Sequence, residues 1–380
     1  MRVVVLGAGF GGLELTTSLV EQLGGAVDIT LIDRNDSFVF GYAKLDALYG
    51  RTPKEEIHIP YREIVKPGVT FRREEITAID PVAKRVTTSA GVYDADVLVV
   101  ALGADYDLAA TPGLAEAGHE FYSVAGAKAA ADVVAAFPGG RVVIGVMTPH
   151  YKCPPAPSEA SMLMDQHLRD KGVRGQSTIT FVTPMPSPLP ISPEAGGAIL
   201  ARFAELGIEA RCATKTTHID PVAKRMHFAT GETLDFDLLL AVPVHVAPAV
   251  VLASGLAESG WIAVERATLK TAFPGVYAIG DVTSVGTPRA GIFAEGAARV
   301  VADQIVAGVR GGNVAPFKGD GQCYIEWGEH RVAEIYVNFL ERSSPYADFL
   351  GPTRAGVDNK AEFGSSRRAR WFGGGAAAAD

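Results

Sequence analysis

Residues 2–12 read RVVVLGAGFGG, and this stretch decides the fold. The opening RVVVL predicts a short strand, and LELTTSLVEQL after the glycines predicts a helix. Between them Gly7 permits a tight turn, Gly9 lets the backbone approach a pyrophosphate, and Gly12 lets the helix pack on the strand. A second predicted strand, VDITLID, ends at Asp33, where an acid is expected to hydrogen-bond a ribose hydroxyl. The N-terminus therefore predicts a Rossmann-like dinucleotide-binding module.

The heptapeptide IDPVAKR occurs twice, at residues 79–85 and 219–225. Asp-Pro suits a type I turn, but a turn alone does not require the following VAKR to match. Each copy is also followed by a short strand, a Gly-centred turn, Asp-x-Asp and an aliphatic run. A match at this long period favours duplicated modules, with convergence on a common hairpin as the alternative.

Composition bounds the class of protein. The 380 residues are 48% hydrophobic and 21% charged, as in a folded globular chain of two or three domains. The net charge of −8 argues against nucleic acid as a partner. No apolar run is long enough for a membrane span, and the start does not read as a signal peptide, so a cytoplasmic protein is expected. The three cysteines form no CxxC pair, so neither a disulfide framework nor a metal site is predicted.

The second module lacks a nucleotide loop. RVVIGV from Arg141 predicts its first strand, but the text that follows, MTPHYKCPPAP, contains no GxGxxG. Prolines at 154, 155 and 157 remove N–H donors that a phosphate needs. The next predicted strand, STITFVTPMP, ends in Thr-Pro, so the acid for the ribose is missing as well. We expect this module to keep the fold without the nicotinamide cofactor.

Cys153 occupies the region of the missing loop. Pro154 favours an extended backbone at Cys153, and a helix predicted from about Ser158 should lower the pKa of its thiol. Glu159, in the first turn of that helix, is placed to relay a proton; the alternative is a structural cysteine with a dipole-satisfying glutamate. Cys323 opens a predicted C-terminal hairpin, CYIEW–GEH–RVAEIYV. Cys212, on a predicted strand, reads as an ordinary core residue.

Three motifs together resemble the FAD-binding halves of two-dinucleotide-domain flavoprotein disulfide reductases: the GxGxxG, DVLVVALG at 96–103 and YAIGD at 277–281. The resemblance implies FAD, with Asp281 near its ribityl chain and a helix N-terminus at 290–292 directed at the flavin pyrimidine. Some relatives attach FAD through a cysteine in the region matching 38–46, which has none here, so non-covalent FAD is expected. The implied cofactor-binding residues are Gly7, Gly9, Phe10, Gly11, Gly12, Asp33, Arg34, Ala101, Gly103, Gly280, Asp281, Ala290 and Gly291.

KCPPAPSE at 152–159, followed by a helix and a later QCY, resembles the sulfide-oxidising branch of these flavoproteins. That branch comprises sulfide:quinone oxidoreductases and flavocytochrome c sulfide dehydrogenases. The resemblance implies a redox pair of Cys153 and Cys323 with Glu159 beside it, which oxidises sulfide or a related small sulfur species and passes electrons to FAD. Without an export signal, a quinone is favoured over a cytochrome as acceptor.

The C-terminal SSRRARWFGG at 365–374 either touches the inner face of a membrane or forms a solvated basic tail; a homodimer is left open. We expect an α/β fold with two Rossmann-like modules and a small C-terminal α+β module. The FAD-binding domain comprises 1–110 and 249–312, the degenerate NAD-type domain 111–248, and the C-terminal hairpin module 313–380. The rival functions are an NAD(P)H-dependent flavoprotein, such as a type II NADH dehydrogenase or a ferredoxin reductase, and a FAD-binding protein without sulfide activity.

Overall fold

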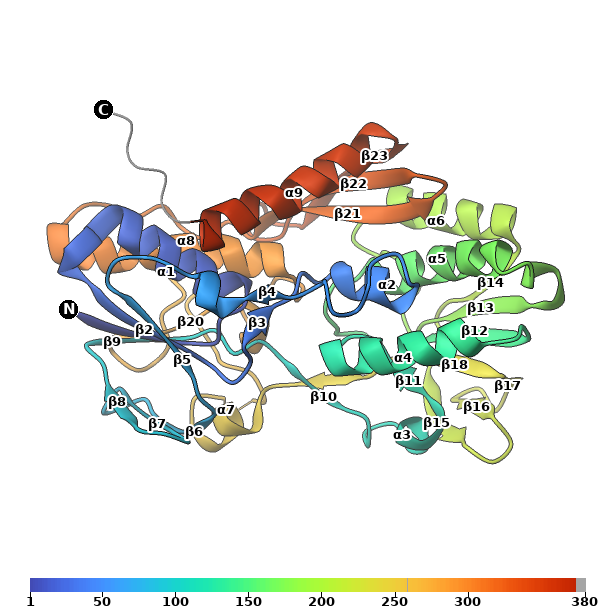
Figure 1. Cartoon of the computed structure of the whole chain (residues 1–380), viewed down its shortest axis with the longest axis horizontal. Helices are drawn as coiled ribbons and strands as arrows, with labels where there is room; N and C mark the ends of the chain where they lie inside the picture. Colours follow the sequence, from blue (N-terminus) through green and yellow to red (C-terminus); the bar gives the residue numbers. More distant parts are fainter. Residues whose placement is uncertain (258, 374–380) are drawn as a thin grey trace.

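Two parallel β-sheets form the frame of the protein, one in each lobe (Figure 1). The computed structural model describes residues 1–257 and 259–373. In the first sheet the strand order is β20-β9-β1-β2-β5, and every neighbouring pair is parallel. Its strands are β1 (Arg2–Leu6), β2 (Asp28–Asp33), β5 (Val69–Arg73), β9 (Val97–Val100) and β20 (Val276–Ala278). Because β20 comes late in the chain, the first sheet is completed only after the second lobe has been built.

The second sheet has the order β11-β18-β12-β13-β14 and is also parallel. Its strands are β11 (His119–Glu120), β12 (Arg141–Val146), β13 (Thr178–Val182), β14 (Ile208–Arg211) and β18 (Leu238–Val242). The helices are α1 (Phe10–Leu23) and α8 (Gly291–Arg310) in the first lobe, and α4 (Val124–Ala136), α5 (Ala156–Asp170) and α6 (Pro193–Leu206) in the second. The near-continuous aliphatic strands β1 and β18 are buried, as parallel strands are. The predicted α/β fold with two Rossmann-like modules is confirmed.

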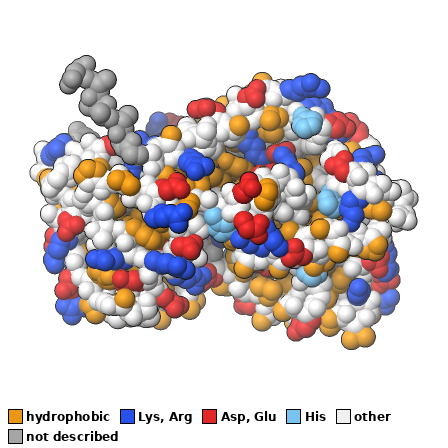
Figure 2. All heavy atoms as spheres, in the orientation of Figure 1, with side chains coloured by type: hydrophobic (Ala, Val, Ile, Leu, Met, Phe, Trp, Pro, Cys, Tyr) orange, Lys and Arg blue, Asp and Glu red, His pale blue; other side chains and the backbone are white. Residues whose placement is uncertain are grey.

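Short elements connect these parts. An antiparallel ribbon of β10 (Asp105–Asp107) and β19 (Val244–Val246) runs between the lobes (Figure 1). The others are β3 (Ser37–Phe38), α2 (Ala43–Leu48), β4 (Ile59–Pro60), α3 (Leu114–Ala117) and α7 (Ala249–Ala253). Figure 2 shows acidic and basic side chains interspersed over both lobes. Among the residues described, none of the helices combines the length and apolarity that a membrane crossing requires.

The two IDPVAKR segments form the same turn in two small antiparallel sheets. The sheets are β6 (Ile76–Asp80), β7 (Arg85–Thr88) and β8 (Val92–Asp94), and β15 (Thr216–Asp220), β16 (Arg225–Phe228) and β17 (Thr233–Asp235). In each turn one aspartate oxygen, of Asp80 or of Asp220, accepts from the amides two and three residues further on, at 2.9–3.0 Å. Lys84 and Lys224 both have a left-handed backbone, with φ of 51° and 49°.

The arginine that ends each heptapeptide has the same partner. Arg85 donates to Asp94 at 2.7 Å, and Arg225 donates to Asp235 at 2.6 Å. Each aspartate is the first of the Asp-x-Asp that follows the hairpin. The matched positions therefore repeat a whole hairpin with its side-chain contacts, which a shared turn alone would not require; this agrees with duplication.

The C-terminal part lies across both lobes, along the top of Figure 1. It comprises an antiparallel sheet of β21 (Asp320–Gly328), β22 (Arg331–Asn338) and β23 (Tyr346–Thr353), followed by helix α9 (Ala355–Phe372). The predicted hairpin around CYIEW is confirmed as β21 and β22. Strand β21 packs against both α5 and α8, so this sheet contacts a helix from each lobe.

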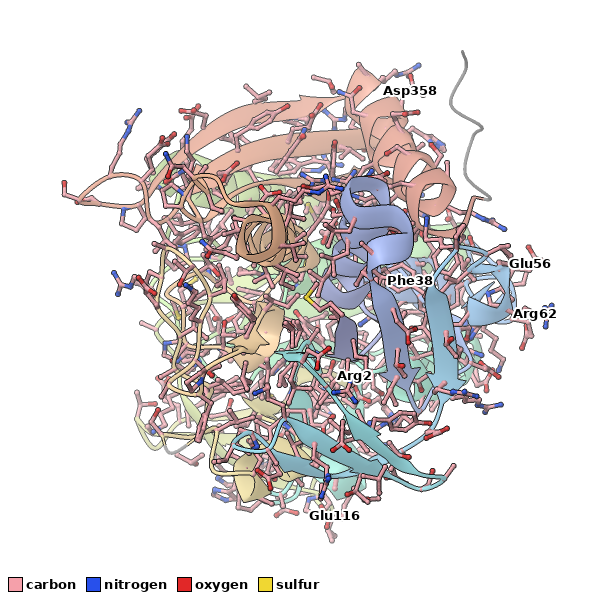
Figure 3. All side chains as sticks on the ribbon, turned by 90° about the vertical axis from the view of Figure 1, so that its left-hand side faces the viewer. Arg2, Phe38, Glu56, Arg62, Glu116 and Asp358 are labelled. Carbon is pink, nitrogen blue, oxygen red and sulfur yellow. The ribbon has the colours of Figure 1, made fainter. Side chains whose placement is uncertain are left out.

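The end of α9 is buried against α1 (Figure 3). The indole of Trp371 is fully buried, and its N–H donates to the carboxylate of Glu14 at 2.7 Å. Arg370 donates to the same carboxylate at 2.9 Å, and Phe372 is buried too. The hypothesis that Trp371 and Phe372 touch a membrane is wrong, because the folded chain uses both rings as core. Gly374, the last residue of that segment, lies outside the described residues, as does the rest of the C-terminal module to 380.

Glu14 is expected to stabilise the fold through this contact. Its side chain is fully buried in helix α1, and hydrogen bonds from Arg370, Trp371 and Arg299 lower its pKa to about 2 against the opposing effect of burial. In Glu14→Gln these donors lose their carboxylate acceptor. We expect the free energy of unfolding near neutral pH to fall by about 2 kcal/mol. Denaturant unfolding measures this difference.

The pH dependence of that difference provides the control. Because the folded-state pKa of Glu14 lies below its ordinary value of 4.5, the contribution is fully present above pH 4.5. It is lost as the pH falls through about 2, so wild type and Glu14→Gln should converge in that window. A constant difference down to the acid limit would contradict the ionic origin of the stabilisation.

Candidate cofactor and cysteine site

One cavity of about 880 Å³ collects the predicted site residues from all parts of the chain. Its wall includes the Gly-rich loop, the loop before α5, the start of α8 and strand β21. Every site residue predicted from the sequence lines it except Gly12. The volume is that of a site for a large cofactor.

The surroundings of the three motif glycines agree with the roles that their spacing predicts. A Cβ on Gly7, whose φ is 98°, would lie 2.5 Å from the carbonyl oxygen of Ala101. A Cβ on Gly12 would lie 1.9 Å from the carbonyl oxygen of Gly7, so helix and loop can approach only without it. A Cβ on Gly9 would meet no protein atom within 4 Å, because that position opens into the cavity. The backbone at Gly9 is therefore bare where a pyrophosphate would lie.

Asp33 lies at the end of β2 and faces the cavity. One of its oxygens accepts from the amide of Ala8 at 2.8 Å, which fixes the acid to the Gly-rich loop. Arg34 forms an ion pair at 3.7 Å with Asp105, and both residues line the cavity. The predicted ribose-binding acid is thus positioned beside the predicted phosphate loop.

The late YAIGD segment approaches the same loop from the opposite side. Gly280 has a φ of 75°, and a Cβ there would lie 2.9 Å from the Cβ of Ala294 in α8. Helix α8 begins at Gly291, and a Cβ on Gly291 would overlap the ring of Phe10. The first amides of this helix face the cavity and are free to bind an anionic group. Burial raises the pKa of Asp281, which lies between these segments.

Cys153 faces the cavity with an unexpected backbone. Its side chain is open to the cavity although protein surrounds the site. Its φ is 50°, so the extended conformation predicted from Pro154 is wrong. The Cys153 amide donates to the carbonyl of Arg289 at 2.7 Å, and its carbonyl accepts from Ala156 at 2.9 Å. These two contacts hold a left-handed residue against its local preference, a kind of strain that often marks functional sites.

The pKa of the Cys153 thiol also differs from the expectation. Burial, followed by the negative charges of Glu159 and Cys323, raises it far above its ordinary value. The amide of Ala156 at the start of α5 and the ammonium of Lys44 act in the opposite direction, but their effects are smaller. The predicted lowering by the helix N-terminus is therefore wrong in sign, because desolvation outweighs it.

Cys323, on β21, lines the same cavity, and both cysteines are free thiols. Burial and the charge of Glu159 raise the pKa of Cys323 to about 12. The negative charge of Glu159 raises the pKa of both thiols, and that of Cys323 also raises the pKa of Cys153, so the three groups are electrostatically coupled. Cys212 follows β14 and does not line the cavity; its side chain is half-buried, so it is only partly a core residue.

Glu159 lies in the first turn of α5, as predicted, and is buried. Burial raises the pKa of its carboxyl to about 7. One of its oxygens accepts from the backbone amide of Glu326 on β21 at 3.0 Å. The side chain of Glu326 in turn binds Lys360 of α9 at 2.6 Å. Glu159 is thus a titratable acid close to neutrality, fixed between α5 and the C-terminal sheet.

Sequence reasoning missed the residues that fix the cysteine loop. The amide of Lys152 donates to Nε2 of His245 at 3.2 Å, and Nδ1 of His245 lies 2.9 Å from the carbonyl of Pro243. Burial lowers the pKa of His245 to about 3, so the neutral ring accepts from Lys152 and donates to Pro243. The Lys44 ammonium donates to the carbonyl of Tyr122. Lys44 is the single cation of residues 38–46, FVFGYAKLD, and this isolated charge in a mainly apolar segment is the signal that could have identified it.

The loop after β12 uses the amides at the start of α5 for its own hydrogen bonds. The amide of Ala156 is used by Cys153, Pro157 has none, and the amide of Ser158 donates to the carbonyl of Pro155 at 2.9 Å. The residue after β13 is Thr183, whose hydroxyl accepts from the amide of Met185 at 3.2 Å. The groups at the start of α5 and after the end of β13, where a nicotinamide dinucleotide would bind, are therefore hydrogen-bonded within the protein.

Fold and cavity together define a protein with two Rossmann-like modules, of which the first brings a Gly-rich loop and an acid to one large cavity. The chain belongs to the pyridine nucleotide-disulphide oxidoreductase family, whose sequence model matches residues 1–304. It is accordingly an FAD-dependent oxidoreductase. Three features of the cavity fit FAD: the open backbone of the Gly-rich loop, Asp33 and the N-terminus of α8.

Relatives of two kinds share parts of the sequence. The mitochondrial sulfide:quinone oxidoreductase of Dictyostelium discoideum is 24% identical over 76% of this chain and 66% of its own. A type II NADH:quinone oxidoreductase of Staphylococcus saprophyticus is 34% identical over 33% of this chain and 32% of its own. The matched segments thus span about a third of the type II relatives and about two thirds of the Dictyostelium protein.

Solved structures share the whole fold. The sulfide:quinone oxidoreductase from Aquifex aeolicus has a TM-score of 0.86 at 22% identity, covering 98% of this chain and 92% of that one. NDH2 from Plasmodium falciparum, solved in complex with NADH, has a TM-score of 0.73 at 13% identity, covering 98% and 96%. At these sequence identities the similarity concerns the fold alone.

Gly9 and Gly12 form a matched pair for testing the cofactor site. Gly9→Ala adds a methyl group that meets only the cavity, so the protein should fold normally and lose most of its bound FAD. Gly12→Ala forces the helix off the loop and should lower stability itself. The ratio of flavin to protein absorbance and the thermal midpoint separate the two. Full flavin retention in Gly9→Ala would contradict the assigned path of the cofactor.

Proposed function

We propose that this chain oxidises sulfide, using Cys153 and Cys323 as a redox pair beside FAD, and delivers the electrons to a quinone. One observation carries the proposal. The two cysteines, far apart in the sequence, line a single cavity with the cofactor-binding residues. A thiol pair, an acid and a flavin site in one cavity supply the groups that this oxidation requires.

The chemistry starts from the oxidised pair. Hydrosulfide attacks the disulfide between Cys153 and Cys323, so one S–S bond forms as another breaks. One cysteine becomes a persulfide and the other leaves as a thiolate, which leaves two electrons on the protein sulfurs. FAD, when bound, supplies the two-electron acceptor for that pair. The left-handed turn at Cys153, held by Arg289 and Ala156, directs this sulfur into the cavity.

Glu159 acts as the proton acceptor of the site. Its pKa of about 7 allows it to exist in both protonation states near neutral pH. The carboxylate takes the proton of the attacking hydrosulfide and, once protonated, no longer raises the pKa of either thiol. Proton uptake by Glu159 therefore favours the thiolate that the reaction releases.

The names of both kinds of relative include a quinone, which supports a quinone as the acceptor. Because quinones with long tails reside in membranes, the proposal includes peripheral contact with the inner face of a membrane by a cytoplasmic protein. The contact would use a surface other than Trp371 and Phe372, which are core residues.

An NADH:quinone oxidoreductase is the second candidate. Its support is the 43% identity over 104 residues to the type II enzyme of Staphylococcus epidermidis, a segment of 27% of this chain. Against it, the amides at the start of α5 are used internally, so the second module offers no free phosphate-binding donors there.

Anaerobic titration of the flavin-loaded protein distinguishes the candidates. We expect sulfide to bleach the visible flavin absorbance in wild type and in Cys212→Ser, whose thiol lies outside the cavity. Bleaching should be lost in Cys153→Ser and in Cys323→Ser, because neither can form the disulfide. Bleaching by NADH and not by sulfide would overturn the proposal, and bleaching by neither would indicate a flavoprotein without this activity.

A pH profile tests Glu159. In wild type, the rate of flavin reduction by sulfide should rise as the pH passes about 7, because the carboxyl is neutral below that pH and ionised above it. We expect Glu159→Gln to reduce the rate about 100-fold well above pH 7 and far less below it. The ratio of the two rates cancels the ionisation of the substrate itself. A ratio that falls as the pH rises would assign Glu159 the role of an acid.

A further inference from the structure

Lys44 is a cation inside the protein without a carboxylate partner. It lies on α2 and lines the cavity. Its ammonium donates to the carbonyl of Tyr122, and within the described part of the chain no carboxylate oxygen lies within 4.0 Å of it. An ammonium has three donors, so this contact leaves two for another ligand. A desolvated charge of this kind requires an anion as partner.

Tyr122 links Lys44 to the cysteine loop. The Lys44 ammonium binds the backbone carbonyl of Tyr122, while the Tyr122 hydroxyl donates to the carbonyl of Cys153 at 3.4 Å. Tyr122 is buried, so both contacts are held within the core. Among the negative charges that act on Lys44, Cys153 has the largest effect, ahead of Glu120 and Asp281. Through the two contacts of Tyr122, Lys44 is connected to the loop that carries Cys153.

A second cation, Lys152, directly precedes Cys153 in the chain and lines the same cavity. Its ammonium donates to the carbonyl of Ala104 at 2.9 Å and lies 4.6 Å from the ring centre of Tyr106. The negative charge with the largest effect on Lys152 is Asp281, on the cofactor side. Lys152 thus contacts Ala104 and the ring of Tyr106, whereas Lys44 is the cation connected through Tyr122 to the carbonyl of Cys153.

We propose that Lys44 forms an anion subsite beside Cys153, which binds the sulfur substrate as a monoanion, hydrosulfide or a persulfide, before it reaches the disulfide. The proposal rests on the proposed function for the identity of its ligand, but the subsite itself can be tested without turnover. Burial and the charge of Lys152 lower the pKa of Lys44 only to about 8, so the ammonium is mostly charged at neutral pH. A neutral substrate would gain nothing from this contact.

Two alkylating reagents that differ in charge measure the subsite directly. The flavin-loaded protein is reduced with dithiothreitol, freed of it under argon, and treated with iodoacetate or with iodoacetamide at neutral pH and low salt. Peptide mass spectrometry gives the rate of modification at Cys153 alone. The ratio of the two rates cancels any change in the fraction of thiolate, because both reagents attack the same sulfur.

We expect Lys44→Met to lower the ratio of iodoacetate to iodoacetamide about tenfold, as removal of one charge close to the reacting sulfur implies. Lys44→Arg retains the charge and should retain most of the ratio. Lys54→Met, which removes a lysine that pairs with Asp132 outside the cavity, should leave the ratio unchanged. Thiosulfate should protect Cys153 against iodoacetamide in wild type and lose this effect in Lys44→Met.

An unchanged ratio in Lys44→Met would overturn the subsite. An unchanged ratio with loss of flavin would overturn it too, and would assign Lys44 to the cofactor phosphates. If Lys44→Met does not fold, Lys44→Gln takes its place with the same expected ratio. A lowered ratio in a protein that sulfide does not bleach would support the anion subsite and overturn the sulfide function. Bleaching by sulfide with an unchanged ratio in Lys44→Met would support the sulfide function and overturn the anion subsite.

Discussion

The buried carboxylate of Glu14 joins the first helix of the chain to its last, and the candidate site depends on that contact. Glu14 binds Arg370 and Trp371 at the end of α9. Earlier in the same helix, Lys360 binds Glu326 of β21, the strand that carries Cys323. Helix α9 therefore links the first lobe, through Glu14, to the strand that carries Cys323. A basic C-terminal segment that reads as a surface feature thus anchors the helix that carries Lys360, which lines the cavity.

The two modules differ in how the corresponding loops use their backbone amides. In the first module the loop after β1 leaves amides and bare glycine backbone open to the cavity. In the second, the corresponding amides before α5 form the turn that carries Cys153. Under the proposed function, the same fold provides a phosphate site in one module and a sulfur site in the other. The shared hairpins, with the same turn at Asp80 and Asp220, mark the common origin.

The sequence predicts the fold well because hydrophobic strands and glycine spacings are local signals. The roles of Gly7, Gly9 and Gly12, the missing second loop and the C-terminal hairpin all follow from short segments. The errors concern Cys153 and Trp371, whose states depend on residues distant in the chain. Arg289 fixes the backbone of Cys153, and burial by the whole fold sets the pKa of its thiol. Local rules, such as the effect of a following proline or of a helix start, are outweighed there.

Burial disfavours the charged form of four groups that line the cavity. Burial raises the pKa of both thiols and of Glu159, and it lowers that of Lys44. The low polarity that disfavours each isolated charge also strengthens the attraction between opposite charges. An anion that enters beside Lys44 therefore gains a partner that water would have screened. A proton taken up by Glu159 removes the repulsion that opposes a thiolate at Cys153. The same desolvation that keeps the resting thiols neutral thus makes the arrival of the anion and the transfer of its proton mutually favourable.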